Sequence, residues 1–174
     1  ALTVIMLALG GAVFMSALNV SSAWNRAVVE DFRMRRYDLS VRFAEAQPID
    51  VIDAALKRMS SVVNAEYWPG AAPYLIDRSG AAGSTVAMAG PTPGSMLLTL
   101  PLVAGRWLWP DDSTGVVINN AVLIRNPTLR VGGKVEVRQE GRTHAFPIVG
   151  IVKELSPMAV IYAPRVAVLA ATGQ

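Results

Sequence analysis

The sequence has no cysteine and only one histidine, His144, among its 174 residues. The missing thiols exclude a disulfide framework, a thiolate metal site and a cysteine nucleophile. A lone histidine is far more often structural or exposed than a ligand, because metal sites need several converging ligands. A phosphate-binding loop is also missing, since Gly132-Gly133-Lys134 is followed by Val135 and lacks the upstream spacing. We therefore predict no cofactor, no metal and no catalytic residues, and we do not expect an enzyme.

Charge is scarce and unevenly placed. Charged residues make up 17% of the chain, against about 25% in a typical soluble domain. All 16 basic and 13 acidic residues lie from Arg26 onward, so residues 1–25 carry no charge. A hydrophobic content of 52% excludes intrinsic disorder. The net charge of +3 is scattered, and the four-residue patch Arg33–Arg36 is too small for a nucleic-acid partner.

What the sequence does contain is a long apolar start. Ala1–Leu18 is an unbroken apolar and small-residue run, long enough for a membrane-spanning helix, and Trp24 suits the membrane interface. A buried core helix and a secretory signal peptide are the alternatives. The signal peptide is disfavoured because there is no basic region before a run that exceeds the usual length. We predict a transmembrane helix over residues 1–23, which could be incomplete.

The same helix is predicted to continue as a stalk over residues 24–36, where there is no glycine or proline and apolar residues recur at helical spacing. A helix of residues 1–36 would be about 54 Å long, and the hydrocarbon core of a membrane is only about 30 Å thick. Part of it must then project into water. We expect Val28, Val29 and Phe32 to couple the stalk to its surroundings.

Residues 37–70 are predicted to form the first part of a small α/β lobe. Tyr37–Phe43 alternates apolar and polar residues as a half-buried strand does. Pro48 opens a helix, and Val62–Trp68 reads as a second strand. The helix places four apolar residues on one face: Ile49, Ile52, Leu56 and Met59. Together these elements make a unit of βαβ size.

Residues 71–155 are predicted to form a β-rich lobe, and residues 156–174 to return, incompletely, to the α/β lobe. Glu140-Gly141-Arg142 indicates a hairpin turn, and Ala121–Arg125 indicates a short helix. The short apolar runs between turn residues, typical of strands, are Tyr74–Ile76, Thr85–Met88, Val116–Ile118, Val135–Val137, Phe146–Val152 and Ala159–Tyr162. The fold class predicted from all this is α+β, with a long N-terminal helix, a small βαβ lobe and a β-rich lobe.

Three tryptophans, Trp68, Trp107 and Trp109, are candidates for a partner-contact patch, because aromatic residues are enriched at interfaces. The alternative is that they cap a core. Asp111-Asp112 could bind a cation, but adjacent side chains point apart and a polar turn after Pro110 is favoured.

Several runs resemble MacB/FtsX-type ABC-transporter permeases, in the extracytoplasmic core domain and part of the first transmembrane helix. Leu102–Trp107, followed by Asp111-Asp112 and Val116–Asn119, is similar to the family's "aGR-f…d…vvi" run. Val131–Val137 resembles its "vGdkv-v" strand, with Gly133 where an acid is common. Further resemblances are Phe146–Val152 to "f-VvGvv" and Ile161–Pro164 to "iy-P". The resemblance covers nearly the whole chain.

The resemblance implies part of a longer permease in the bacterial cytoplasmic (inner) membrane, with residues from about Trp24 onward extracytoplasmic. It implies a separate cytoplasmic ABC ATPase subunit or domain, a second permease copy or half, and motion transmitted through the stalk. The substrate or partner would be an extracytoplasmic protein, lipoprotein or peptide. The alternative function is a membrane-tethered β-rich binding module that recognises a protein partner without transport.

Overall fold

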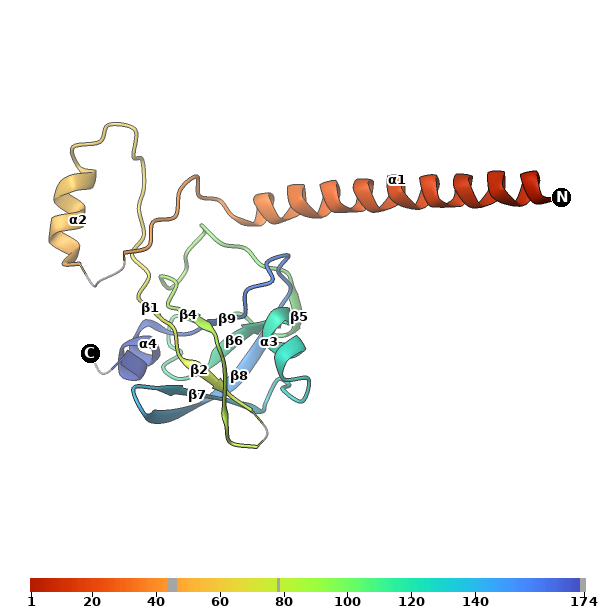
Figure 1. Ribbon diagram of the computed structural model, residues 1–174. Helices are drawn as coiled ribbons and strands as arrows, with labels where there is room; N and C mark the ends of the chain where they lie inside the picture. The colour runs from red at the N-terminus through yellow and green to blue at the C-terminus, as the bar shows by residue number, and fades with distance from the viewer. Residues whose placement is uncertain (44–46, 78, 173–174) are drawn as a thin grey trace.

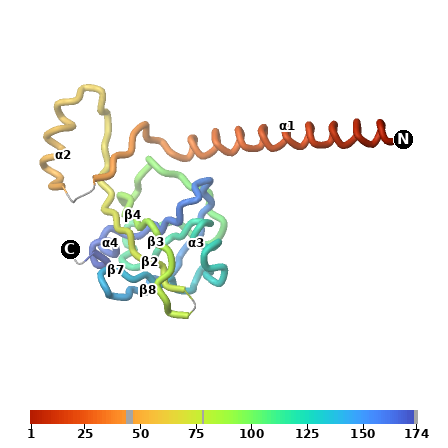
Figure 2. Tube along the Cα trace, in the orientation of Figure 1, coloured from red at the N-terminus to blue at the C-terminus, as the bar shows by residue number. Residues whose placement is uncertain are grey.

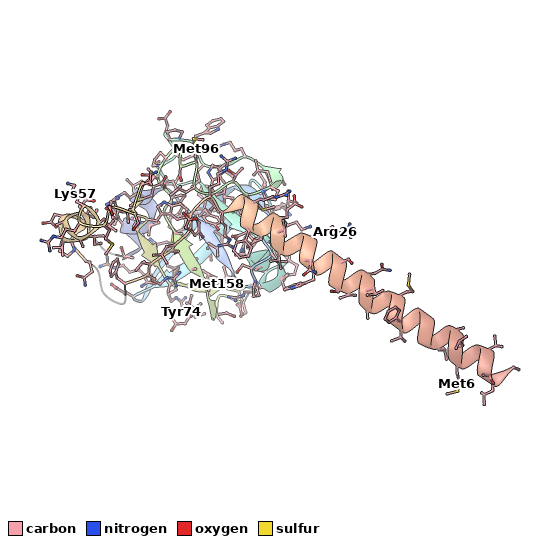
Figure 3. All side chains as sticks on the ribbon, turned by 90° about the horizontal axis from the view of Figure 1, so that it is seen from above. Met6, Arg26, Lys57, Tyr74, Met96 and Met158 are labelled. Atoms are coloured by element: carbon pink, nitrogen blue, oxygen red, sulfur yellow. The ribbon has the colours of Figure 1, made fainter. Side chains whose placement is uncertain are left out.

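The computed structural model describes residues 1–43, 47–77 and 79–172. Its first element, α1 (Leu2–Met34), is a single helix of 33 residues that projects well beyond the rest of the molecule (Figure 1). Seen from above, Met6 lies near the free end of α1, and Arg26 lies closer to the domain (Figure 3). At about 1.5 Å per residue the helix is about 50 Å long. The predicted uninterrupted helix is confirmed, and it ends two residues earlier than expected.

α1 is long and apolar enough to cross a membrane, by its length and composition, and it alone meets this test among the described residues. None of its residues is buried within the chain. The apolar stretch long enough to span a membrane is therefore not covered by the described part of the chain, which disfavours the core-helix alternative. Leu7, for example, is 80% exposed.

The remaining elements form a mixed sheet with three short helices: α2 (Ile49–Leu56), α3 (Asn120–Arg125) and α4 (Arg165–Thr172). The strands are β1 (Gly70–Ala71), β2 (Tyr74–Ile76), β3 (Ala82–Thr85), β4 (Ala87–Ala89), β5 (Leu102–Gly105), β6 (Val116–Asn119), β7 (Lys134–Gln139), β8 (Arg142–Val152) and β9 (Val160–Tyr162). Their order is β1-β4-β9-β6-β8-β7-β2-β3, with β5 pairing to β8. The pairs β4–β9 and β6–β8 are parallel. The predicted α+β class is confirmed.

The sheet curls back on itself. β1 and β2 are separated by only two residues in the chain, yet they lie at or near opposite ends of the strand order. The long strand β8 permits this curvature, because its first part pairs with β7 and its last part with β6 and β5. The β7–β8 hairpin turns at Glu140 and Gly141, which both have positive φ, as a tight hairpin turn requires. This hairpin was predicted and is confirmed.

Both faces of the central strand β6 are covered. Val116 and Ile118 belong to the larger hydrophobic cluster, and Val117 between them belongs to a smaller one. The smaller cluster consists of five buried residues: Leu98, Leu100, Val117, Val152 and Tyr162. We call it the junction cluster, because Met34 at the end of α1 packs against it.

Two strand predictions are wrong. Residues 37–43 and 62–68 have no strand structure, and both stretches contain strongly exposed apolar residues such as Leu39 and Val63. A strand needs a neighbour to satisfy its backbone, and no described residue pairs with either stretch. The helix between them is confirmed as α2, although it ends at Leu56, before Met59. Figure 2 shows α2 and its flanking segments lying apart from the sheet.

Most runs predicted as strands in the β-rich stretch coincide with observed strands, but β5 was not expected. The single run predicted over Thr85–Met88 is wrong, because the structure divides it at Val86 between the end of β3 and the start of β4. The last strand, β9, was assigned from sequence to the α/β lobe, but it pairs with β4 and β6 inside the main sheet. The proposed domain boundaries themselves stay a prediction.

Candidate functional site at the end of the first helix

α1 ends where its backbone begins to pair with the sheet domain. The Arg36 amide donates to the Leu97 carbonyl over 2.9 Å, and the Thr99 amide donates to the Met34 carbonyl over the same distance. Arg35 is extended, with φ −100° and ψ 102°, and forms a bridge with Leu98. The helix therefore ends without glycine or proline, because the backbone groups of its last turn find partners in the segment before β5.

Arg35 joins three parts of the chain through its guanidinium. Its Nε donates to Asp31 Oδ2 over 3.1 Å, one turn back on α1, and Nη1 donates to the Tyr37 hydroxyl over 3.2 Å. Its Nη2 lies 3.5 Å from Glu154 Oε1, just beyond β8. Burial disfavours the charged guanidinium, but the Tyr37 hydrogen bond and the Asp31 carboxylate outweigh burial and raise the pKa of Arg35. Arg35 is therefore a permanent cation at the junction.

Glu154 is the acidic partner on the sheet side and is only 4% exposed. Its Oε1 accepts from the Tyr162 hydroxyl over 2.9 Å, and its Oε2 accepts from Asn119 Nδ2 over 2.8 Å. Burial, followed by the negative charge of Glu154, raises the pKa of Tyr162, so this hydroxyl remains a donor. A buried carboxylate is tolerated when it is paired and hydrogen-bonded in this way.

Asn119 is fully buried and connects the pair to the sheet. Its Oδ1 accepts from the amides of Val122 and Val160 over 3.2 and 3.1 Å, and so caps α3 and holds β9. Its Nδ2 donates to Glu154 and to the Met158 carbonyl, each over 2.8 Å. The carboxamide therefore has every polar site in use. We call Asp31, Arg35, Glu154, Asn119 and Tyr162 the junction network.

The predicted coupling residues of the stalk are buried to different extents. Val28 is half-buried on the side that meets the domain, together with Ala27 and Asp31. Val29 and Phe32 are 50% and 72% exposed. Their role in coupling stays a prediction.

The three tryptophans do not form one patch. Trp68 and Trp107 are half-buried and pack against the junction cluster, as expected of residues that cap a core. The Trp107 ring lies 5.3 Å from the ring of Tyr162, and the Trp68 indole donates to Glu66 over 2.8 Å. Trp109 alone is strongly exposed, at 62%. Whether any of them contacts a partner stays a prediction.

The Trp109 loop is held in shape by a second ion pair. Arg106 donates to both carboxylate oxygens of Asp112 over 2.6 and 2.8 Å, and its guanidinium carbon lies 3.9 Å from the centre of the Trp109 ring. The Arg106 guanidinium, against a smaller opposing effect of burial, holds the pKa of Asp112 below its usual range. Asp112 thus closes a turn.

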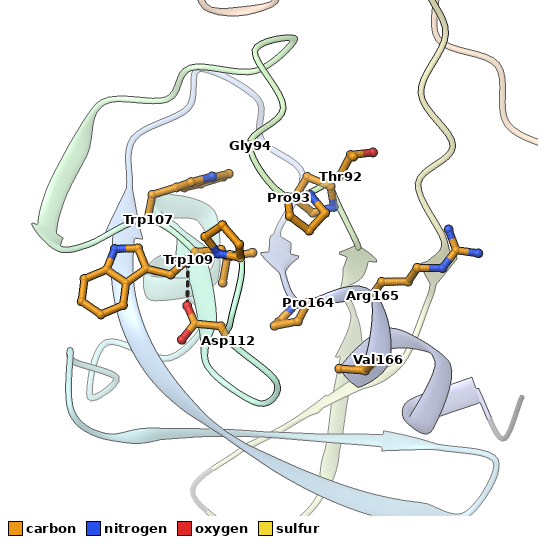
Figure 4. A pocket seen from close by; sticks show the side chains of 12 residues that line it. Thr92, Pro93, Gly94, Trp107, Trp109, Asp112, Pro164, Arg165 and Val166 are labelled. Carbon is orange, nitrogen blue, oxygen red and sulfur yellow. Dashed lines mark hydrogen bonds between the residues drawn. The ribbon is translucent and has the colours of Figure 1, made fainter.

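Beside this loop is a shallow pocket of about 130 Å³ with four prolines in its lining, two of which, Pro93 and Pro164, are labelled in Figure 4. Trp107 and Trp109 stand on one side, and Pro164, Arg165 and Val166 on the other. The Arg165 guanidinium points away from the tryptophans (Figure 4), so the pocket holds no converging charged groups. No cluster of three or more metal-ligating side chains occurs within the described ranges.

Two of the motif glycines meet in space. Gly105 of β5 and Gly150 of β8 are register partners, and both are so close to the opposite strand that neither position has room for a side chain. A Cβ on Gly150 would lie 2.0 Å from the Arg106 carbonyl oxygen, and one on Gly105 would lie 2.2 Å from the Val149 carbonyl oxygen. This contact places the chain just before the Trp109 loop against β8.

Sequence reasoning did not identify Arg35, Glu154 or Asn119 as site residues. Asn119 carries a local signal, since an asparagine after an apolar strand and before a helical run is a common helix cap. Arg35 and Glu154 carry none, because their pairing joins segments that are remote in sequence.

Comparisons with known proteins give a matching family and similar solved structures. A family model described as the MacB-like periplasmic core domain matches residues 1–174. Among solved structures, the chain is similar to the periplasmic region of MacB from Actinobacillus actinomycetemcomitans, with 20% identity over 71% of this chain and a TM-score of 0.47. It is also similar to a domain of a protein assigned as a permease from Porphyromonas gingivalis, with 15% identity over 66% of this chain, 54% of that chain and a TM-score of 0.43.

The chain spans 58% of the length of the MacB periplasmic structure. None of the curated proteins compared matches it. The family match covers every residue, from the apolar helix to the last strand and helix of the sheet domain. The chain therefore belongs to the family of MacB-like periplasmic core domains.

Proposed function

We propose that this chain is the extracytoplasmic part of an ABC-transporter permease and that α1 transmits ATPase-driven motion from the membrane to the sheet domain. The observation that carries the proposal is the continuity of α1, which runs without a break from a charge-free segment to Met34. A helix without a kink can pass on a rigid-body motion to the domain at its end. The family match supports the assignment to a permease.

In this proposal residues 1–23 cross the bacterial cytoplasmic membrane, and the domain from about Trp24 onward lies outside. A separate cytoplasmic ABC ATPase hydrolyses ATP, and a second permease copy or half completes the transporter. The domain itself carries no catalysis. It acts on an extracytoplasmic substrate or partner, such as a protein, lipoprotein or peptide.

The topology can be tested by labelling a cysteine placed on the exposed end of the β7–β8 hairpin. Because the 174 residues contain no cysteine, Arg142→Cys adds a single reactive site to this part of the protein. In intact cells the full-length variant is expected in the membrane fraction and accessible to a membrane-impermeant maleimide. Recovery from the cytosol, or labelling only after lysis, would contradict the proposal. The parent protein controls for cysteines elsewhere.

Transmission of motion through α1 can be tested with Val28→Pro, because an interior proline removes a helix hydrogen bond and kinks the helix. Val28→Ala at the same position is the matched control. We expect the proline variant to lose transport-linked ATPase activity and the alanine variant to retain it. Equal activity in both would refute transmission through α1.

The exposed Trp109 and its pocket favour a second candidate function, a tethered binding module without transport. That function predicts that Trp109→Ala abolishes partner binding while Val28→Pro has no effect on the protein's cellular role. The two functions are therefore separated by the same pair of variants.

A further inference from the structure

We propose that Arg35 and Glu154 are positioning residues that fix the angle between α1 and the sheet domain, so that the two move as one body. This inference rests on the proposed function, because an angle-fixing contact matters only if α1 carries motion.

Among the described residues, the backbone hydrogen bonds that join α1 to the sheet domain lie at the last residue of the helix and just beyond it. The two hydrogen bonds to residues 97 and 99 leave from Met34 and Arg36, and Met34 also supplies the contact with the junction cluster. A helix held at one end only can pivot there. Apolar contact by the half-buried Ala27 and Val28 limits this motion weakly, because such contact is not directional.

The Arg35 side chain supplies the second point of attachment. Asp31 binds its Nε from one turn back along α1, and Glu154 lies 3.5 Å from its Nη2 on the sheet side. The guanidinium is planar and rigid, so partners at two of its nitrogens fix a direction as well as a position. The contact therefore resists rotation of α1 about its end.

Glu154 is suited to anchor this contact because hydrogen bonds from the sheet hold its carboxylate in place. It is bound by Tyr162 of β9 and by Asn119 at the end of β6, two neighbouring strands near the middle of the sheet. Its backbone amide also donates to Asn120 Oδ1 over 2.7 Å. A displacement of Arg35 is thus resisted by the core of the domain and not by a surface loop.

The expected displacement follows from the distance along α1 between the attached end and the labelled residue. Ser22 lies 12 residues before Met34, about 18 Å along the helix, so a tilt of about 20° would move it by about 6 Å. A spin label at Ser22 and a second at the exposed Glu136 of β7 would report this tilt as a change in their distance distribution.

The experiment uses the full-length permease with its ATPase in nanodiscs, doubly spin-labelled at Ser22→Cys and Glu136→Cys. The test variants are Glu154→Gln, Arg35→Gln and their combination. The matched controls are Asp77→Asn and Arg125→Gln, which make the same chemical changes elsewhere on the domain. Asp77 caps the turn before β3, and Arg125 donates to the Thr85 carbonyl.

We expect each test variant to broaden or shift the distance distribution by several ångströms, and the combined variant to add little, because both changes remove one pair. We also expect transport-linked ATPase activity to fall about fivefold or more, with both controls unchanged. A distribution as narrow as in the parent for Arg35→Gln and Glu154→Gln would overturn the proposal.

Because Glu154 is buried, its variant could simply unfold, which loss of the near-ultraviolet dichroism of the protein's aromatic side chains would reveal. In that case Asp31→Ala is the decisive variant, because it removes the hydrogen bond between Asp31 and Arg35 and changes no residue of the sheet. An unchanged distribution in Asp31→Ala and Arg35→Gln would overturn the proposal, and a broadened one would support it. If Val28→Pro loses transport-linked ATPase activity while the Arg35 and Glu154 variants retain it, this inference fails and the proposed function stands.

Discussion

Replacing Gly150 by alanine should open the contact between β5 and β8, because the added methyl group has no space. Its Cβ would lie 2.0 Å from the carbonyl oxygen of Arg106 and 3.0 Å from the carbonyl carbon. Even a close C–H···O contact needs about 3.3 Å between carbon and oxygen. The two strands must therefore separate by roughly 1.3 Å, and the obstacle is backbone, which cannot rotate away as a side chain would.

The magnitude can be worked from the contacts that this separation breaks. The Arg106 amide donates to the Val149 carbonyl over 3.0 Å, and a displacement of over 1 Å removes that hydrogen bond. Overpacking costs about 1–3 kcal/mol, and a lost hydrogen bond about 1 kcal/mol more. Alanine also lowers the conformational entropy of the unfolded chain, which offsets about 0.5 kcal/mol of this loss. We expect a net loss of about 3 kcal/mol in the stability of this strand pair, roughly a hundredfold in its opening equilibrium.

Hydrogen exchange measured by mass spectrometry on the full-length protein reads this opening locally. Peptides that cover residues 102–106 and 146–152 should exchange about a hundredfold faster in Gly150→Ala. Gly70→Ala is the matched control, because its Cβ would meet the Met88 carbonyl oxygen at 3.6 Å, an ordinary contact. Unchanged exchange in Gly150→Ala, or an equal loss in Gly70→Ala, would refute the reasoning from close approach.

Three further predictions concern buried hydrogen bonds and acid sensitivity. Asn119→Ala removes a helix cap and an acceptor for a β9 amide, so the free energy of unfolding should fall by about 3 kcal/mol in urea titrations. Tyr162→Phe removes one donor from Glu154 and should cost about 1.5 kcal/mol, with the tryptophan emission maximum of the protein unchanged. A large emission shift would mean that the tilted ring contact with Trp107, and not the hydroxyl, was disturbed. The pKa of Asp112 lies below its usual value, so its ion pair with Arg106 stabilises the loop fully above about pH 4 and is lost as the pH falls through the lowered pKa. Acid should therefore loosen the Trp109 loop, which fluorescence quenching would detect. The variant Asp112→Asn should lack this transition.

The local features of the fold could be predicted because neighbouring residues determine them. A charge-free apolar run without glycine or proline predicted α1, and the turn residues at Glu140 and Gly141 predicted the β7–β8 hairpin. The buried runs that became β6 and the last part of β8 were predictable in the same way. Each of these depends on residues within one element or one turn.

Most of the failures involve partners that are far away in sequence; the division of Thr85–Met88 between β3 and β4 is a local failure. Alternation over residues 37–43 suits a strand, but a strand forms only beside another, and no described strand lies there. β5 was missed for the opposite reason, since all four of its residues are exposed and it forms by pairing with β8. The Arg35–Glu154 pair likewise depends on the folded arrangement and on no local pattern.

The place of β9 between β4 and β6 sets an order of events during synthesis. β9 comes late in the chain but supplies the parallel partner of β4 and the antiparallel partner of β6. While the ribosome extends the chain, α1 is complete long before the sheet can close, because pairings between distant segments form slowly. β4 and β6 are therefore left without this neighbour until residues 160–162 emerge. We expect nascent chains that stop before Val160 to hold an open sheet edge, which makes them substrates for chaperones and proteases outside the membrane.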